Sequence, residues 1–191
     1  MKLVFATHNQ NKFKEVKLLL PSHIELMSLT DIGCTEDIPE TAETIEGNAV
    51  LKTEFIRNHY GLDCFADDTG LEVSALNSEP GVHSARYAGE NKNSEDNIDK
   101  LLKNLADKED RSARFKTAIA LSINIQSVLF LGTCDGTITR VRRGEKGFGY
   151  DSVFLPEGSK ETFAEMNLQE KSKVGHRGKA MRQLIAYLTQ G

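Results

Sequence analysis

The first third of the chain alternates short apolar runs with segments of helical periodicity. Residues 2–6, 24–27 and 62–66 are short apolar runs, and each predicts a strand. Between them, apolar side chains recur every three or four residues over 13–20 and 51–60, which predicts two helices. This order of strands and helices is typical of an α/β fold.

The middle of the chain predicts a long pair of strands. Helical spacing over 97–105 is followed by two strand-like runs, 114–125 and 128–140, which only a short polar connection separates. Such runs predict an antiparallel hairpin. With a closing helix around 181–188, the pattern favours an α/β fold with a mixed sheet. We expect one domain over 1–191, in which the hairpin forms a second lobe and an active-site cleft lies between the lobes.

Charge narrows the class of ligand. The 24 Lys and Arg residues against 28 Asp and Glu residues give a net charge of −4. The chain therefore lacks an overall basic field, and we expect no nucleic acid as a partner. A polyanionic ligand would need a local basic site.

The cysteines and the apolar runs bear on the location of the protein. Cys34, Cys64 and Cys134 are far apart without a CxxC pair, which fits neither a disulfide framework nor a thiolate zinc site. No stretch approaches the ~20 apolar residues of a membrane span. The apolar run after Met1 is too short for a secretory signal. We expect a cytoplasmic protein that makes no contact with a membrane.

Two adjacent carboxylates, Asp67 and Asp68, follow the strand predicted at 62–66. Successive residues of a strand point to opposite faces, so we do not expect both to face the core. One can point into a cleft at the carboxyl end of the strand, where open α/β sheets usually bind ligands. A solvated Asp-Asp turn is the alternative. Mg²⁺ prefers carboxylate and phosphate oxygens, so these two residues and the acid-rich loop 36–43 are candidate ligands.

Residues 7–12, Thr-His-Asn-Gln-Asn-Lys, join the first predicted strand to the first predicted helix. The amino end of a helix presents unpaired N–H groups and a positive dipole, which suit a phosphate. Thr7 and Asn9 can hydrogen-bond to phosphate oxygens, and Lys12 supplies a positive charge. The segment lacks the GxxxxGK[ST] pattern. The alternative is that Asn or Thr simply caps the helix.

Two later segments add a possible base site and a basic cluster. Residues 144–151 combine three glycines with two aromatic rings that can clasp a flat base, although a plain hairpin turn accounts for them equally well. Residues 171–179 are basic, and Lys171, His176 and Arg177 can donate to phosphate or to a keto oxygen. A solvated basic turn is the alternative. Together with the carboxylates, these segments favour nucleoside triphosphate chemistry.

Five blocks, in order along nearly the whole chain, resemble the inosine triphosphate pyrophosphatase family, the Ham1-like non-canonical purine nucleotide pyrophosphatases. The blocks are T-x-N-x-x-K at 7–12, D-D-T-G-L at 67–71, P-G-V-H-S-A-R-Y-A-G at 80–89, G-F-G-Y-D at 147–151, and Lys171 followed by His176-Arg177. The resemblance implies an elongated, two-lobed α/β fold and a homodimer. It also implies Mg²⁺-dependent cleavage of ITP, dITP and XTP between the α and β phosphates.

The resemblance further implies a role for each matching residue. Asp68 would be the proton acceptor and would bind Mg²⁺ with Glu40. Our own hypothesis adds that Lys12 and Lys171 stabilise charge on the departing pyrophosphate. A 6-keto purine accepts a hydrogen bond where adenine donates one, so donors at the base would favour it. The residues implied to bind substrate are Thr7, His8, Asn9, Gln10, Asn11, Lys12, Thr69, Phe148, Gly149, Tyr150, Asp151, Lys171, His176 and Arg177.

Two positions depart from the pattern of the family. Gly47 stands where many relatives carry Glu, and Gly175 stands where Ser is usual. Three other functions stay open at this point. One is a Maf-like nucleotide pyrophosphatase, and another is a nucleotide sensor without hydrolysis, in which Asp67-Asp68 would be turn residues. The third is RNA binding, which the absence of Trp and the negative charge disfavour.

Overall fold

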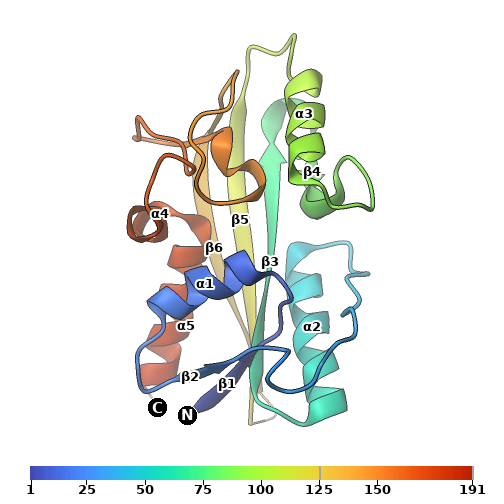
Figure 1. Ribbon diagram of the computed structural model, residues 1–191, viewed down its shortest axis with the longest axis vertical. Coiled ribbons are helices and arrows are strands. Elements are labelled where there is room, and N and C mark those ends of the chain that lie inside the picture. The colour runs from blue at the N-terminus through green and yellow to red at the C-terminus, as the bar shows by residue number, and fades with distance from the viewer. Residues whose placement is uncertain (125, 191) are drawn as a thin grey trace. The chain divides into compact units, whose positions relative to one another are not determined.

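The computed structural model describes residues 1–124 and 126–190 (Figure 1). The helices are α1 Gln10–Leu19, α2 Ile45–Tyr60, α3 Ser94–Asn104, α4 Leu168–Val174 and α5 His176–Thr189. The strands are β1 Lys2–Phe5, β2 Glu25–Met27, β3 Cys64–Val73, β4 Pro80–Gly81, β5 Ser112–Ile123, β6 Gln126–Ile138 and β7 Phe154–Pro156. Single 3₁₀ turns lie at η1 Ser74–Leu76, η2 Ser84–Arg86 and η3 Gly149–Ser152.

The strands form a mixed sheet. Their order is β2-β1-β3-β5-β6-β7, and β4 pairs with β3 off this path. β1 runs parallel to β2 and to β3, whereas β4 and β7 run antiparallel to their neighbours. β5 and β6 are neighbours joined by two residues, a connection too short for parallel strands. The predicted α/β class with a mixed sheet is confirmed.

The chain divides into two compact units. Unit 1 comprises Met1–Asp68, Thr117–Gly132 and Lys179–Gly191, and unit 2 comprises Thr69–Lys116 and Thr133–Gly178. β3, β5 and β6 contribute residues to both units. Each unit has its own hydrophobic core.

Unit 1 buries both faces of its part of the sheet. On one face, the rings of Phe5 and Phe65 stack with centroids 4.6 Å apart and lie in a cluster with Val16 of α1 and Met181 of α5. On the other face, Ile56 of α2 joins a separate cluster that includes apolar residues of β1 and β3. Figure 1 shows α2 on one side of these strands, and α1 and α5 on the other. Helices on both faces explain why these short strands are continuously apolar.

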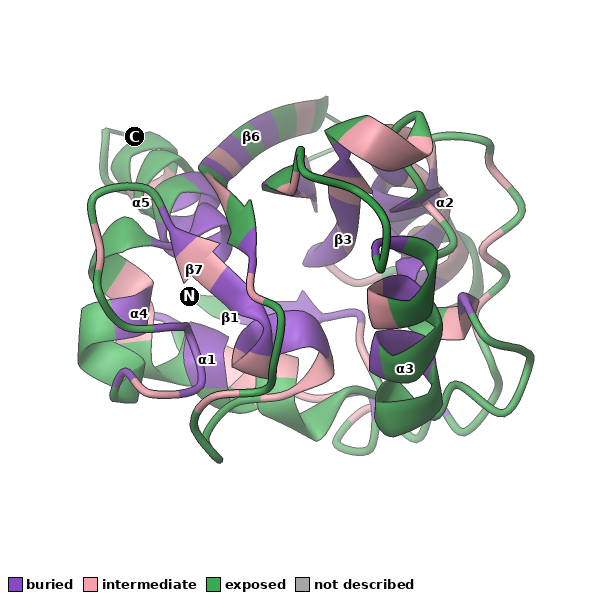
Figure 2. Cartoon of the chain, turned by 90° about the horizontal axis from the view of Figure 1, so that it is seen from above, coloured by how far each residue is buried: buried purple, intermediate pink, exposed green. Residues whose placement is uncertain are grey.

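Unit 2 is built around aromatic rings from its strands. Phe115 of β5 meets the ring of Phe154 of β7 edge-on, with centroids 4.7 Å apart, and stacks at 5.9 Å with Phe163. Ile98 and Leu101 of α3 are buried in the same cluster. Figure 2 shows that α3 is buried along its inner face and exposed along the outer one. This one-sided burial matches the helical spacing of its apolar residues.

The sequence located most of the elements correctly. The strands expected near residues 2–6 and 24–27 and the helices expected over 13–20, 51–60 and 97–105 are confirmed within a few residues. The hairpin strands and the last helix are also present. β4 and β7 were not predicted. Ile125, in the first predicted hairpin strand, and Gly191, at the end of the predicted domain, lie outside the described residues.

The predicted end of the third strand is wrong. The sequence indicated a strand over 62–66 that stopped at an Asp-Asp turn, but β3 continues through both carboxylates to Val73. The continuation is stabilised because Leu71 and Val73 are fully buried in the core of unit 2. Asp67 and Asp68 therefore lie within a strand rather than at its carboxyl end, and the solvated turn is excluded.

Within the described residues, none of the helices combines the length and the apolar character needed to cross a membrane.

The stacked pair Phe5–Phe65 leads to a prediction about stability. Phe65 is fully buried, so we expect Phe65→Ala to lower the free energy of unfolding by about 3–5 kcal/mol. Chemical denaturation measures this change. The control Leu18→Ala removes a side chain that is 46% exposed and should change stability by less than about 1 kcal/mol. Equal losses in the two variants would contradict the assignment of this core.

Candidate active site

The segment from Thr7 to Lys12 forms the capped start of α1. The Asn9 side chain accepts hydrogen bonds from the backbone N–H groups of Asn11 (2.9 Å) and Lys12 (3.1 Å), and Thr7 Oγ1 accepts one from Asn9 N–H (3.2 Å). The capping role weighed for Asn9 is confirmed. His8, Asn9, Gln10 and Asn11 are exposed, so this turn can also meet a ligand.

His8 connects this turn to the acid-rich loop. Its Nε2 lies 2.9 Å from the carbonyl oxygen of Glu36. Four residues after Glu40, the loop ends at Thr44, which caps the start of α2. The Thr44 hydroxyl accepts a hydrogen bond from the N–H of Gly47. The loop that carries Glu40 is therefore held at both ends.

Asp67 and Asp68 are both buried, with 1% and 8% of their surface exposed, yet they contact different helices. Asp67 Oδ1 lies 3.0 Å from the Nζ of Lys12, near the start of α1. Asp68 Oδ1 lies 3.3 Å from the Nζ of Lys52, on α2. Neighbouring strand residues do alternate, so the two carboxylates face different helices. The expectation that they would not both face the core is wrong, because helices cover both faces of this part of the sheet and both side chains are buried.

Lys52 joins Asp68 to the acid-rich loop. Its Nζ is 2.5 Å from Glu40 Oε1, and it also donates to the backbone oxygen of Asp67 at 3.1 Å. Asn48, one turn earlier on α2, donates from Nδ2 to the second oxygen of Asp68 at 3.2 Å. Asn48 Oδ1 in turn accepts the N–H of Ala42, in the same loop, at 2.9 Å.

Sequence reasoning missed Lys52 and Asn48. The available signal was their spacing, because residues four apart share one helix face, and both are polar positions on a helix whose other buried residues are mostly apolar. Of the acids in the loop, the structure brings Glu40 to Asp68, whereas Glu36, Asp37 and Glu43 are exposed.

The Glu40–Asp68 pair fits a hard cation. Both carboxylates already contact a single positive charge, the Lys52 ammonium. Among residues 1–124 and 126–190, no group of three or more His, Cys, Asp or Glu residues could hold a metal ion. A cation held by this pair would take its remaining ligands from water and phosphate oxygens, which is the usual coordination of Mg²⁺ in nucleotide sites.

Gly47 is explained by packing at the start of α2. A Cβ atom at this position would lie 2.7 Å from the Cβ of Ala42 and 3.0 Å from Thr44 Oγ1. The helix start and the loop before it therefore approach too closely for a side chain.

In unit 2, Asp151 and Lys171 form a buried ion pair. Asp151 Oδ2 lies 2.6 Å from Lys171 Nζ and also accepts the N–H of Phe148 at 2.9 Å. The ammonium lies over the Phe148 ring, 4.9 Å from its centroid. Gly147, at φ +77°, makes room for this pair, because a Cβ there would collide with the Asp151 carboxylate. The glycines of this segment thus serve packing as well as turning.

Tyr150 is buried, with 5% of its surface exposed. Its hydroxyl donates to the backbone oxygen of Ser84 at 2.9 Å, and burial raises its pKa above the ordinary value. The Ser84 hydroxyl accepts the N–H of Leu71 at 2.8 Å and donates to Gly81 O at 2.6 Å. The P-G-V-H-S-A-R-Y-A-G block therefore connects β3 to η3, and of the two aromatic residues in 147–151 it is Phe148 that is partly exposed.

His176 and Arg177 begin α5 and are both buried. Arg177 Nη2 donates to Thr69 Oγ1 at 3.0 Å, and the guanidinium carbon Cζ lies 5.8 Å from the centroid of the Phe148 ring. The His176 ring stacks on Phe115, with centroids 4.5 Å apart. The solvated basic turn is excluded for these residues, and Thr69, Phe148 and Arg177 are brought together.

Gly175 and Gly178 let α4 and α5 meet closely. A Cβ at Gly175 would lie 2.7 Å from the Lys171 carbonyl oxygen, and one at Gly178 would collide with the Ser172 backbone. Lys171 belongs to α4 and Arg177 to α5. This tight junction allows both side chains to lie over the same aromatic ring, that of Phe148.

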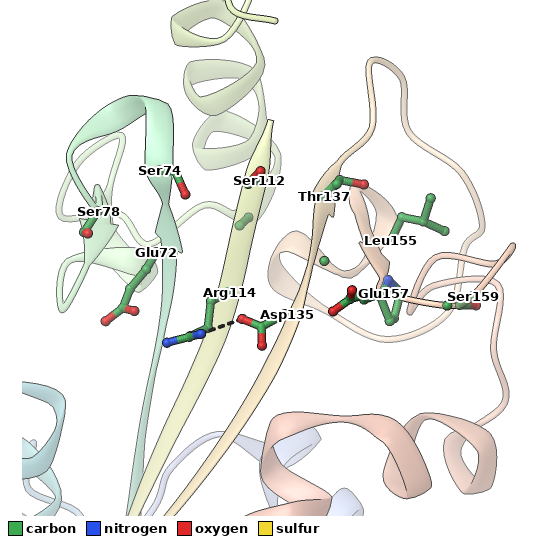
Figure 3. A pocket seen from close by; sticks show the side chains of 14 residues that line it. Glu72, Ser74, Ser78, Ser112, Arg114, Asp135, Thr137, Leu155, Glu157 and Ser159 are labelled. Carbon is green, nitrogen blue, oxygen red and sulfur yellow. Dashed lines mark hydrogen bonds and ion pairs between the residues drawn. The ribbon is translucent and has the colours of Figure 1, made fainter. Parts of the chain in front are cut away.

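A separate hollow of about 690 Å³ lies in unit 2 and contains none of the predicted site residues (Figure 3). Its most polar contact is an exposed ion pair, Arg114 Nε to Asp135 Oδ1 at 2.6 Å, with Glu72 nearby. Both partners are about half exposed, so this pair is worth at most ~1 kcal/mol.

Comparison with known proteins gives one family. The model of the Ham1 family matches residues 3–187. The chain is 60% identical to a dITP/XTP pyrophosphatase from Christiangramia forsetii, with 100% of both chains covered. It is 57% identical to a protein of the same name from Flavobacterium johnsoniae, over 99% of this chain and 98% of the relative.

Solved structures agree with the sequence matches. A Ham1 protein from Coxiella burnetii superposes with a TM-score of 0.91 at 40% identity, covering 100% of both chains. The Ham1 protein of Staphylococcus aureus gives 0.90 at 39% identity, covering 100% of this chain and 99% of the other.

The Asp151–Lys171 pair leads to a prediction. Lys171→Met leaves a buried carboxylate without its cation, so we expect a loss of about 3–5 kcal/mol in the free energy of unfolding. The double variant Lys171→Met/Asp151→Asn removes both charges and should recover a large part of that loss. Urea denaturation of Lys171→Met, Asp151→Asn and the double variant measures the coupling energy between the two charges. A double variant less stable than either single variant would contradict a charge-paired site.

Proposed function

The chain belongs to the Ham1 family, and on that premise we propose that it hydrolyses the non-canonical purine nucleotides ITP, dITP and XTP. The products are the nucleoside monophosphate and pyrophosphate. The observation that carries this proposal is identity of 60% and 57%, over essentially full length, with two proteins named dITP/XTP pyrophosphatase. The reaction removes these non-canonical nucleotides from the nucleotide pool.

The phosphates are bound by unit 1 in this proposal. The start of α1 offers backbone N–H groups and a positive dipole, and Lys12 adds a charge. Glu40 and Asp68 hold Mg²⁺, which supplies charge neutralisation for the triphosphate. Asp68 accepts the proton of the water that attacks the α phosphorus. Asn48 orients the Asp68 carboxylate for this task.

The base is recognised by unit 2. Phe148 offers a partly exposed aromatic face, with Lys171 and Arg177 close to its ring. Donors on Lys171, His176 and Arg177 favour an acceptor at purine position 6, which hypoxanthine and xanthine have and adenine lacks. Tyr150 acts through its hydrogen bond to Ser84 rather than by stacking. Thr69, whose hydroxyl accepts a hydrogen bond from Arg177, also contacts the substrate.

Residues 1–191 act as one catalytic domain in this proposal, since the family match spans both units. The protein works in the cytoplasm as a homodimer. Its partner is the small nucleotide substrate, without nucleic acid or membrane.

Product analysis tests the activity directly. With Mg²⁺ present, we expect ITP, dITP and XTP to give monophosphate and pyrophosphate, resolved by anion-exchange chromatography, with ATP and GTP turned over far more slowly. Diphosphate and phosphate as products would refute the assignment of the cleaved bond. Tight binding without any product would favour the nucleotide sensor.

The role of Asp68 gives a second prediction. Asp68→Asn keeps the shape of the side chain but removes the proton acceptor, so we expect kcat for XTP to fall by about 10²–10⁴-fold. Binding of XTP, measured by calorimetry, should change far less. The matched control Asp135→Asn alters the exposed ion pair in unit 2 and should keep kcat within about twofold of the parent. A rate near that of the parent in Asp68→Asn would remove Asp68 from the mechanism.

A further inference from the structure

The contacts of Lys52 are those of a bound cation. Its ammonium lies 2.5 Å from Glu40 Oε1, 3.3 Å from Asp68 Oδ1 and 3.1 Å from the Asp67 carbonyl oxygen. Three oxygens, one from the acid-rich loop and two from β3, thus surround one positive charge. The side chain is only 8% exposed.

The electrostatic balance keeps this ammonium charged. Burial acts to lower the pKa of Lys52, but attraction to Asp68, Glu40 and Asp67 outweighs burial, and the pKa is raised above its ordinary value. Conversely, the same ammonium offsets part of the negative charge of Glu40 and Asp68, whose nearest oxygens lie 2.5 Å and 3.3 Å from its Nζ.

We propose that the Lys52 ammonium occupies the cation position between Glu40 and Asp68, and that a divalent ion binds there only by displacing it. Metal binding is then an exchange of one cation for another, and Lys52 sets the affinity. This inference rests on the proposed function only in naming Glu40 and Asp68 as metal ligands.

The exchange has a physical consequence for the nucleotide-free protein. A displaced, largely buried ammonium loses its counter-ions, which is unfavourable unless another anion accompanies the metal. The protein should therefore hold divalent ions weakly when no phosphate is present. Lys52 would act as a positioning residue, because its ammonium holds both carboxylates around a single cation position.

Removing the charge of Lys52 tests the exchange. In Lys52→Met the competing cation is absent while the length of the side chain is nearly kept. We expect Mg²⁺ and Mn²⁺, titrated by calorimetry into nucleotide-free protein, to bind on the order of tenfold or more tightly than in the parent. The melting temperature of this variant should also rise with added Mg²⁺ far more than that of the parent.

Arg57→Met is the matched control, because it removes one positive charge from the same helix. Arg57 pairs with Asp63 at 3.1 Å and contacts neither Glu40 nor Asp68. The Mg²⁺ affinity of Arg57→Met should stay within about twofold of the parent if the effect of Lys52 on metal binding is local and does not come from net charge. Equal or weaker metal binding in Lys52→Met than in the parent would overturn the proposal, as would equal tightening in both variants.

A measurement on the unmodified protein covers the case in which Lys52→Met does not fold. The NMR signal of the Lys52 Cε–Hε group is assigned by its loss in Lys52→Arg. We expect this signal to shift when Mg²⁺, free of paramagnetic Mn²⁺, is added to saturation. A signal that stays unchanged while calorimetry records metal binding would overturn the exchange. Neither readout uses nucleotide turnover, so the fate of the proposed hydrolysis is decided separately by product analysis.

Discussion

Two neighbouring carboxylates within a buried strand need two cations, and the arrangement of unit 1 follows from that requirement. Asp67 and Asp68 lie on β3, and alternation sends them to opposite faces. Lys12 neutralises one from α1, and Lys52 neutralises the other from α2. An unpaired carboxylate at either position would be strongly destabilising, so the two helices are coupled electrostatically to the same strand. The apolar clusters on each face hold the helices where these ion pairs need them.

Unit 2 solves a similar problem with aromatic surroundings. The Asp151–Lys171 pair is buried beside the rings of Phe148 and Phe163. The hydroxyl of Tyr150, the neighbour of Asp151, donates a hydrogen bond to the backbone oxygen of Ser84 and so holds this residue in place. Buried charge pairs of this kind are poor stabilisers in comparison with apolar packing. Under the proposed function, their value would lie in fixed charges that need no rearrangement when a charged substrate arrives.

Packing explains why several small residues are required at these sites. Gly47, Gly147 and Gly178 each lie where a Cβ would collide with a neighbouring group. The first lets the loop that carries Glu40 approach α2, and the second accommodates the Asp151 carboxylate. The third lets α5 approach α4 closely, which allows Lys171 and Arg177 to lie over the same Phe148 ring. Close backbone approach, rather than flexibility, is the common reason for these glycines.

Periodicity and turn chemistry in the sequence determined the α/β class, most helices and strands, and the residue types available for phosphate and base recognition. Such features are local, because helix spacing and strand alternation are properties of a few consecutive residues. Only the tertiary structure decided that β3 runs on through Asp67 and Asp68, since burial of Leu71 and Val73 outweighs a local turn signal. It also decided that Lys52 and Asn48 belong with Glu40 and Asp68. The spacing of Lys52 and Asn48 shows only that they share one face of α2. Which counter-ion such a side chain meets depends on the packing of elements that are distant along the chain.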